Sequence, residues 1–243
     1  MGTRGLWGFR KNNEDKLTYN HYDSYPSGLG REIIEFIQNN CLELESICKR
    51  IKLVDEDSTP TEKQIKELKD FADLTVSTRS EDDWYCLLRK AQDDKNAYAK
   101  GLKYMIDSKD FILNSCFCEY AYIINLDTKK LEIYVGFQNT PDKTNRYGYT
   151  PNEDGYYPCR MVYAIDLIYV IRCQDNNELI KKIEKVIKST LSEEEMRETL
   201  LADGINFALV DKMTKEQLIE ATSIEDYDDY NNYLLALAVL YDI

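Results

Sequence analysis

The stretch that decides the fold is "EYAYIINLDTKKLEIYVGF", residues 119–137. It holds two runs rich in Ile, Tyr and Val, one on each side of the polar tetrapeptide "DTKK". Branched and aromatic residues around a short polar segment are typical of a β-hairpin. The stretch therefore predicts two paired antiparallel strands.

The next apolar run, "CRMVYAIDLIYVIR", covers residues 159–172 and follows a loop at 138–158 that is rich in Gly, Pro, Asn and Tyr. Because the run is apolar at nearly every position, it predicts a central strand that is covered on both faces. Asp166 interrupts the run, and we expect a buried partner for its carboxylate.

The N-terminal part predicts a second hairpin, with strands at residues 3–10 and 16–22 around the turn "KNNED". Apolar residues at spacings of three and four then predict helices. The expected helical segments are residues 33–51, 61–72, 79–92, 98–113 and 177–189. This order predicts an α+β fold, with a mostly antiparallel sheet and packed helices in a core domain at residues 1–190.

Residues 191–243 carry most of the net charge of −13. They hold 13 acidic and 3 basic residues, while residues 1–190 hold 31 and 28. Capping-box patterns and many Leu, Ile, Phe and Val residues predict an acidic helical subdomain here. The acidic charge disfavours direct binding to nucleic acid and suits either a basic protein partner or a solvated surface. The candidate interface residues are Glu193, Glu194, Glu195, Asp226, Asp228 and Asp229.

A candidate ligand site lies in "YNHYDSYPSGLGREIIEFI", residues 19–37, which contains the only histidine. A strand end, a glycine-bearing loop and a helix start can together present polar side chains and backbone N–H groups to a ligand. The stretch has neither the Walker pattern nor the dinucleotide fingerprint. The residues expected to line such a site are Arg4, Asn20, His21, Asp23, Tyr25, Ser27, Gly28 and Gly30.

The same residues have structural interpretations that remain open. His21 can hold the bend through a hydrogen bond to a backbone carbonyl, because one histidine alone defines no reaction. The tyrosines can pack with their hydroxyl groups at the surface. Gly28 and Gly30 can serve the geometry of helix entry.

The chain lacks the sequence patterns that are typical of several catalytic and metal sites. One histidine excludes a histidine-rich zinc centre, and there is no Gly-x-Ser-x-Gly elbow. A magnesium site built from carboxylates stays open, but Asp and Glu are too numerous for the sequence to select its ligands, so we assign no catalytic residue, metal or cofactor. The seven cysteines are an odd number, which is typical of reduced thiols inside a cell. No apolar run approaches a membrane span and no secretory h-region is present, so we expect a soluble, cytoplasmic protein.

Two resemblances add to this interpretation. "MGTRGLWGF" and "YNHYDSYPSGLG" resemble the start of a group of uncharacterised phage, prophage and bacterial proteins, as do "DWYCLLRKAQ" and "EYAYIINLDTKKLEIY" further along. This resemblance implies a phage-associated setting in a bacterial host cell, where small acidic proteins often antagonise host defences. The order of hairpin, helices and antiparallel strands is also similar to that of N-terminal-nucleophile hydrolases. Their nucleophile would fall at Gly2, which has none, and Thr3 would become terminal only after further processing.

Three hypotheses follow. The favoured one is a non-catalytic interaction protein of phage type, which binds a bacterial defence protein that has a basic surface. The second is a protein or enzyme that binds a small molecule, such as a nucleotide signal, at the corner around His21. The third is an amidohydrolase of the N-terminal-nucleophile type.

Overall fold

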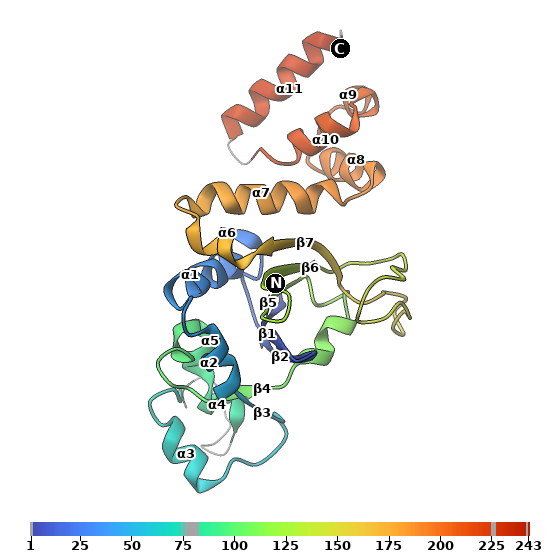
Figure 1. Ribbon diagram of the computed structural model, residues 1–243. Coiled ribbons are helices and arrows are strands. Elements are labelled where there is room, and N and C mark those ends of the chain that lie inside the picture. The colour runs from blue at the N-terminus through green and yellow to red at the C-terminus, as the bar shows by residue number, and fades with distance from the viewer. Residues whose placement is uncertain (1, 74, 76–82, 225–226, 242) are drawn as a thin grey trace. The chain divides into compact units, whose positions relative to one another are not determined.

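The computed structural model describes residues 2–73, 75, 83–224, 227–241 and 243 (Figure 1). The contacts within the chain divide it into two compact units, Met1–Asn177 and Glu178–Ile243. The first unit contains a mixed β-sheet with helices, and the second contains helices. The fold class is α+β, as the sequence predicts. The division falls near the start of helix α7 (Asn176–Ser189), whereas the sequence predicts a boundary after residue 190.

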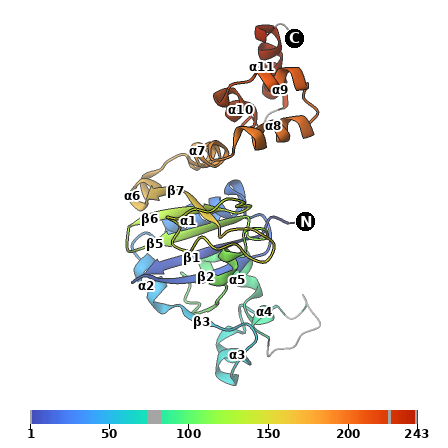
Figure 2. The same ribbon diagram turned by 90° about the vertical axis from the view of Figure 1, so that its right-hand side faces the viewer.

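The main sheet has the strand order β2-β1-β5-β6-β7. Neighbouring strands are antiparallel except for β1 and β5, which run parallel. The strands of this sheet, seen from two sides in Figures 1 and 2, are β1 (Gly5–Lys11), β2 (Glu14–Asn20), β5 (Tyr120–Asn125), β6 (Lys130–Val135) and β7 (Arg160–Asp166). Both predicted hairpins are therefore present, and the sheet is mostly antiparallel.

The turn of the first hairpin explains its tight register. Asn12 and Asn13 have φ of 54° and 61°, as a two-residue type I′ turn requires, and asparagine tolerates this conformation better than most residues. The Asp127 carboxylate accepts hydrogen bonds from the N–H groups of Asn12 and Asn13, both at 2.9 Å. These hydrogen bonds lower the pKa of Asp127 and fasten the two hairpin turns together.

The expected central strand at residues 159–172 is wrong. Only its first half is a strand, β7, which lies at the edge of the sheet, and the chain then forms helix α6 (Leu167–Arg172). Leu167 and Val170 are buried at helical spacing. A short continuous apolar run fits a buried strand or a half-buried helix equally well, so periodicity could not separate the two. Asp166 is exposed, and its carboxylate lies 3.8 Å from the Lys130 ammonium instead of having a buried partner.

The expected helix at 33–51 is broken into α1 (Arg31–Asn39) and α2 (Leu44–Arg50). At the end of α1, the Phe36 carbonyl accepts from the Asn40 N–H at 3.1 Å and also from the Asn40 side-chain amide at 2.8 Å. The expected helix at 98–113 is also wrong. Its middle is strand β4 (Tyr104–Ile106), which pairs in parallel with β3 (Lys52–Val54).

The remaining short elements of the first unit follow the sequence more closely. Thr61 and Gln64 form a capping box at the start of α3 (Glu62–Leu68), and Asp83 caps α4 (Trp84–Leu87). The segment expected to be helical from residue 79 begins outside the described residues. The other short helices are α5 (Arg89–Asp93), η1 (Pro26–Gly30), η2 (Lys95–Ala97) and η3 (Lys109–Leu113).

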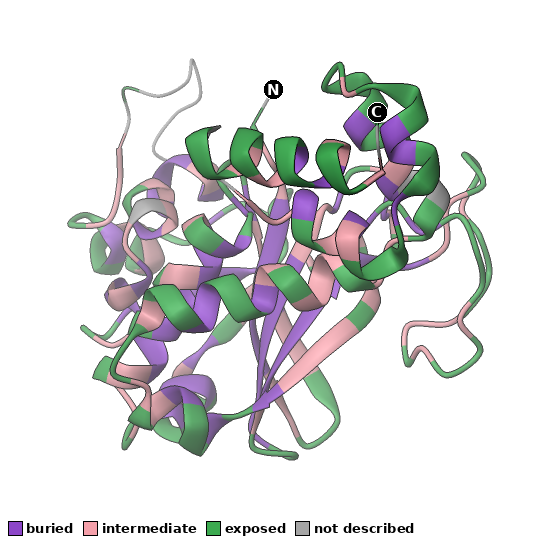
Figure 3. Ribbon diagram, turned by 90° about the horizontal axis from the view of Figure 1, so that it is seen from above, coloured by how far each residue is buried: buried purple, intermediate pink, exposed green. Residues whose placement is uncertain are grey.

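The main sheet is covered on both faces. On one face, the rings of Trp7 and Phe9 pack edge-on against Phe36 of α1, at centroid distances of 5.8 and 6.1 Å. On the other face, Leu6 and Ile123 belong to a cluster that includes Ile112 of η3 and, from the loop, Tyr147. Figure 3 shows burial concentrated in the strands, while the helices expose one side. Apolar burial on both faces is the main source of stability for such a sheet.

The ion pairs of Glu45, in α2, should make the stability of the protein depend on pH. The Glu45 carboxylate lies 2.7 Å from the Lys129 ammonium and 3.0 Å from that of Lys11, and these hydrogen bonds lower its pKa from 4.5 to about 2. A lowered folded-state pKa gives a stabilisation that is complete above pH 4.5 and is lost as the pH falls toward 2. Glu45→Gln should therefore flatten the dependence of the unfolding midpoint on pH in this window. Because the group is exposed, high salt should weaken the effect in the unmutated protein, and an unchanged pH profile would contradict the assignment.

The second unit has a core of its own. Its helices after α7 are α8 (Glu193–Ala202), α9 (Phe207–Lys212), α10 (Lys215–Ala221) and α11 (Tyr227–Tyr241). Thr214 and Gln217 form the predicted capping box of α10. Arg197 of α8 donates hydrogen bonds to the carbonyls of Val210 and Met213, which join three segments. The buried side chains of this core are Met196, Leu200, Leu209, Val210, Met213, Leu218, Ala221, Leu234 and Leu237.

Candidate functional site

The corner between β2 and α1 is fixed by side-chain hydrogen bonds. The Asn20 amide donates to the Tyr22 carbonyl at 2.5 Å and to the Ser24 hydroxyl at 2.9 Å. Ser24 is fully buried, and its N–H donates to the Thr3 carbonyl at 3.1 Å. Asp23 has φ of 54°, so the chain bends sharply here and then enters η1. The corner is therefore a rigid feature of the fold.

The backbone amides of this corner are engaged within it. The N–H groups of Gly28 and Gly30 donate to the Tyr25 carbonyl, and that of Leu29 donates to the Asp23 carbonyl at 2.8 Å. A Cβ atom at Gly28 would lie 2.2 Å from the Asp23 carbonyl oxygen, so glycine is required there for close packing. These amides cannot also donate to a phosphate group, as they would have to if the corner bound a nucleotide through its backbone N–H groups.

The other predicted ligand residues lie apart from one another. His21 is exposed, and its Nδ1 atom lies 3.4 Å from the Tyr19 hydroxyl. Tyr25 and Ser27 are exposed, and the Asp23 carboxylate raises the pKa of Tyr25 by its charge and a hydrogen bond. The Arg4 guanidinium lies 4.7 Å from the centre of the Phe117 ring. The cavity that opens beside the corner is not lined by Arg4, His21, Tyr25 or Ser27.

A cavity of about 100 Å³ does open beside the corner. Lys95 is 5% exposed, and its ammonium donates to the Asn20 side-chain oxygen at 3.0 Å and to the Gln92 carbonyl. It also lies 3.5 Å from the Glu32 carboxylate. Of the predicted ligand residues, only Asn20 and Asp23 line this cavity. Its lining residues are Asn20, Tyr22, Asp23, Leu29, Glu32, Gln92 and Lys95.

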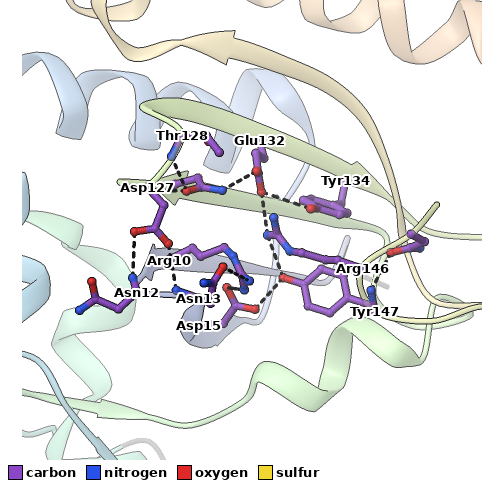
Figure 4. A network of polar contacts seen from close by, with 12 residues as sticks. Arg10, Asn12, Asn13, Asp15, Asp127, Thr128, Glu132, Tyr134, Arg146 and Tyr147 are labelled. Carbon is purple, nitrogen blue, oxygen red and sulfur yellow. Dashed lines mark hydrogen bonds and ion pairs between the residues drawn. The ribbon is translucent and has the colours of Figure 1, made fainter.

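A second polar cluster lies on the sheet face beneath the loop at residues 138–158 (Figure 4). The Glu132 side chain is 6% exposed, and its carboxylate lies 2.7 Å from the Arg146 guanidinium. The same carboxylate accepts from the Asn125 amide at 2.7 Å and from the Tyr134 hydroxyl at 3.2 Å. The buried charge of Glu132 is thus matched by one cation and two further donors.

Arg146 connects this cluster to the loop. Its guanidinium lies 5.4 Å from the Tyr134 ring centre and 5.0 Å from that of Tyr147. The Tyr147 hydroxyl donates to Asp15 at 3.1 Å, and Asp15 pairs with Arg10 at 3.0 Å. Burial raises the pKa of Tyr134 and of Tyr147, which keeps both phenols protonated. This network anchors the loop to the sheet.

Only some residues of the predicted acidic interface lie in the part of the chain that the structure describes. Glu193 lies 3.7 Å from Arg197, and Asp228 and Asp229 are exposed in the first turn of α11. Asp226, and the side chains of Glu194 and Glu195, lie outside the described residues.

Helix α11 has an unusual distribution of apolar residues. From Tyr230 to Tyr241 it contains no charged residue. Leu234 and Leu237 face the core of the second unit, but three large side chains point outward. Leu235, Val239 and Leu240 are 65%, 75% and 68% exposed, and we call these three residues the outer face of α11. Helices that are apolar all round are normally buried on every side.

No family model, curated protein or solved structure matches the chain. Within the described ranges, no helix has the length and apolar character needed to cross a bilayer. Those ranges also contain no group of three or more His, Cys, Asp or Glu side chains placed to hold a metal ion.

Proposed function

We propose that this chain is a non-catalytic interaction protein whose second unit binds a basic protein partner through the outer face of α11. The proposal rests on helix α11, which has apolar side chains on two sides. Only one of these sides packs against the core of the second unit. Contiguous exposed apolar side chains on a folded protein typically mark an interaction site. Association with a partner would remove Leu235, Val239 and Leu240 from water.

The charge around this face favours a basic partner over a second copy. Asp228 and Asp229 begin the helix, and residues 191–243 carry a net charge of −10. Of their three cations, Arg197 binds carbonyls of its own unit and Lys212 donates to the Tyr241 carbonyl at 3.2 Å. Two copies would bring like charges together, whereas a partner with Lys and Arg beside an apolar stripe complements the surface.

A designed amphipathic helix provides the probe. We expect an 18-residue peptide with Leu on one face and Lys on the other to bind in fluorescence anisotropy, and its Glu-for-Lys counterpart not to bind. The triple variant Leu235→Ser, Val239→Ser, Leu240→Ser should weaken binding at least tenfold, because central apolar contacts carry most of the affinity of such an interface. Leu42→Ser, at a 96% exposed position of the first unit, serves as the matched control.

Two outcomes would reject the proposal. Equal binding by the triple variant would show that the peptide senses acidic charge alone. Concentration-dependent dimerisation that the triple variant abolishes would show that a second copy covers the face. Circular dichroism of the triple variant verifies that its helices are retained.

The narrower hypothesis, a phage protein that antagonises a bacterial defence component, rests on the sequence resemblance of residues 1–137. The same variant tests it in cells. Expression of the unmutated chain should restore plating of a phage that the defence system restricts, and expression of the triple variant should not. Failure of both to restore plating would remove this hypothesis and leave the peptide result unaffected.

A further inference from the structure

We propose that the cavity beside the β2–α1 corner binds a small neutral molecule through adjacent hydroxyl groups, such as the ribose diol of a nucleoside. This site is in the first unit and is independent of the outer face of α11. It is defined by a cavity of about 100 Å³ whose lining includes two acidic residues, two amide residues and a buried lysine. That volume exceeds the space one water molecule needs several times over.

Lys95 has a positioning role in this site. An ammonium has three N–H donors, and the acceptors around this one include the Asn20 side-chain oxygen, the Gln92 carbonyl and the Glu32 carboxylate. The group is buried, so it must keep such partners to offset its desolvation. Lys95 therefore orients Asn20 and Glu32 and is not a free cation that waits for an anionic ligand.

The groups that remain able to bind a ligand are mainly acceptors. Half of the Glu32 side-chain surface is exposed, and Asp23 is an exposed residue at the rim. A carboxylate offers two oxygens that can accept from neighbouring hydroxyl groups, as acidic residues do with ribose in dinucleotide sites. Leu29 forms an apolar wall, and the Tyr22 ring provides an aromatic surface for a flat ring system.

The same arrangement excludes phosphate. Asp23 and Glu32 place two negative charges around one lysine, so a third anion would be repelled. The N–H groups of Gly28, Leu29 and Gly30, which could have offset that repulsion, are engaged within the corner. The specificity we infer is therefore for the uncharged nucleoside over the nucleotide.

Isothermal titration with three related compounds tests this specificity. Adenosine should bind, while 2′-deoxyadenosine, which lacks one hydroxyl of the diol, should bind at least tenfold more weakly. AMP should also bind at least tenfold more weakly than adenosine because of its phosphate. Free ribose and putrescine distinguish a sugar-only site and a cation site from the proposed one.

Each other result overturns the proposal. No heat with adenosine or ribose, or equal binding of AMP and adenosine, would show that the cavity is not a diol site. Tighter binding of putrescine than of adenosine would show that the carboxylates serve a cation. Ribose that binds as well as adenosine would overturn the nucleoside specificity, because the Tyr22 ring would then contribute nothing to binding.

Two substitutions on α1 compare a residue that lines the cavity with a residue that does not. Glu32→Gln removes the charge that accepts from the diol and should weaken adenosine binding at least tenfold. Glu35→Gln removes an exposed charge from the same helix without touching the cavity and should leave binding unchanged. Thermal melts of both variants report on folding, and unchanged adenosine binding by a folded Glu32→Gln protein would refute the assignment.

Discussion

Replacement of Arg146 by methionine should lower the free energy of unfolding by about 3–5 kcal/mol, which is the range for breaking a buried ion pair from one side. Methionine keeps the length and apolar body of the side chain, so the change removes mainly the charge and the donors. Glu132 would then be left with a buried carboxylate and only neutral partners, Asn125 and Tyr134. Urea denaturation followed by circular dichroism measures the loss.

A substitution of Glu132, the partner of Arg146, distinguishes the effect of the ion pair from the effect of the contacts around it. Glu132→Gln retains the shape of the side chain but replaces one accepting oxygen with an NH2 donor, although Asn125 donates to one oxygen and Tyr134 and Arg146 approach the other. We expect a cost of about 1–3 kcal/mol, because one acceptor is lost and Arg146 is left without its counter-charge. The double variant should cost clearly less than the sum of the two single variants, because the uncompensated charge is absent from it. Arg172→Met, at an exposed arginine, should stay within about 0.5 kcal/mol of the unmutated protein.

Additive effects in this cycle would contradict the network as drawn in Figure 4. A loss below 1 kcal/mol for Arg146→Met would show that the loop at residues 138–158 is not anchored by this side chain. The loop should also become more sensitive to proteolysis in the Arg146→Met protein, because Tyr147 would lose a hydrogen-bond donor at 3.1 Å along with the stacked guanidinium.

The hairpins could be predicted from the sequence because their signals are local. Asn12 and Asn13 tolerate the left-handed turn, and the Ile- and Tyr-rich runs at 119–137 pair with each other across four residues. The segment 159–172 could not be assigned in the same way. Whether Leu167 and Val170 extend a strand or begin a helix depends on their packing partners, and a single apolar run does not encode them.

The candidate sites show even more clearly that a local sequence pattern does not predict contacts between distant parts of the chain. Asn20 and Asp23 could be chosen because they flank a glycine loop, but Lys95 lies 75 positions away from Asn20 along the chain. Glu132 and Arg146 are likewise brought together by a loop whose path no local pattern specifies. The sequence also directed attention to His21, because it is the only histidine. Uniqueness of a residue type carries no information on burial, and the structure leaves His21 exposed.

Gly28→Ala should destabilise the first unit by about 3 kcal/mol or more and remove the cavity beside the corner. The added methyl group would lie 2.2 Å from the Asp23 carbonyl oxygen and 3.0 Å from the Tyr25 ring. The ring can move, but the carbonyl accepts the Leu29 N–H and belongs to the backbone of the bend. Gly28 also has φ of −96° and ψ of −105°, an orientation that is unfavourable for residues with a Cβ atom.

Two substitutions at nearby positions should reduce the stability less than Gly28→Ala does. Gly30→Ala brings a methyl group to 3.1 Å from the Tyr122 ring, and the better helix propensity of alanine offsets part of that contact, so we expect a change of less than about 1 kcal/mol. Ser27→Ala, at an exposed position of the same loop, should change stability by less than about 0.5 kcal/mol. Thermal unfolding of the three proteins gives the order directly. If Gly28→Ala were as stable as Ser27→Ala, the close approach of Gly28 to Asp23 could not be what shapes the corner, and the binding cavity beside it would lose its structural basis.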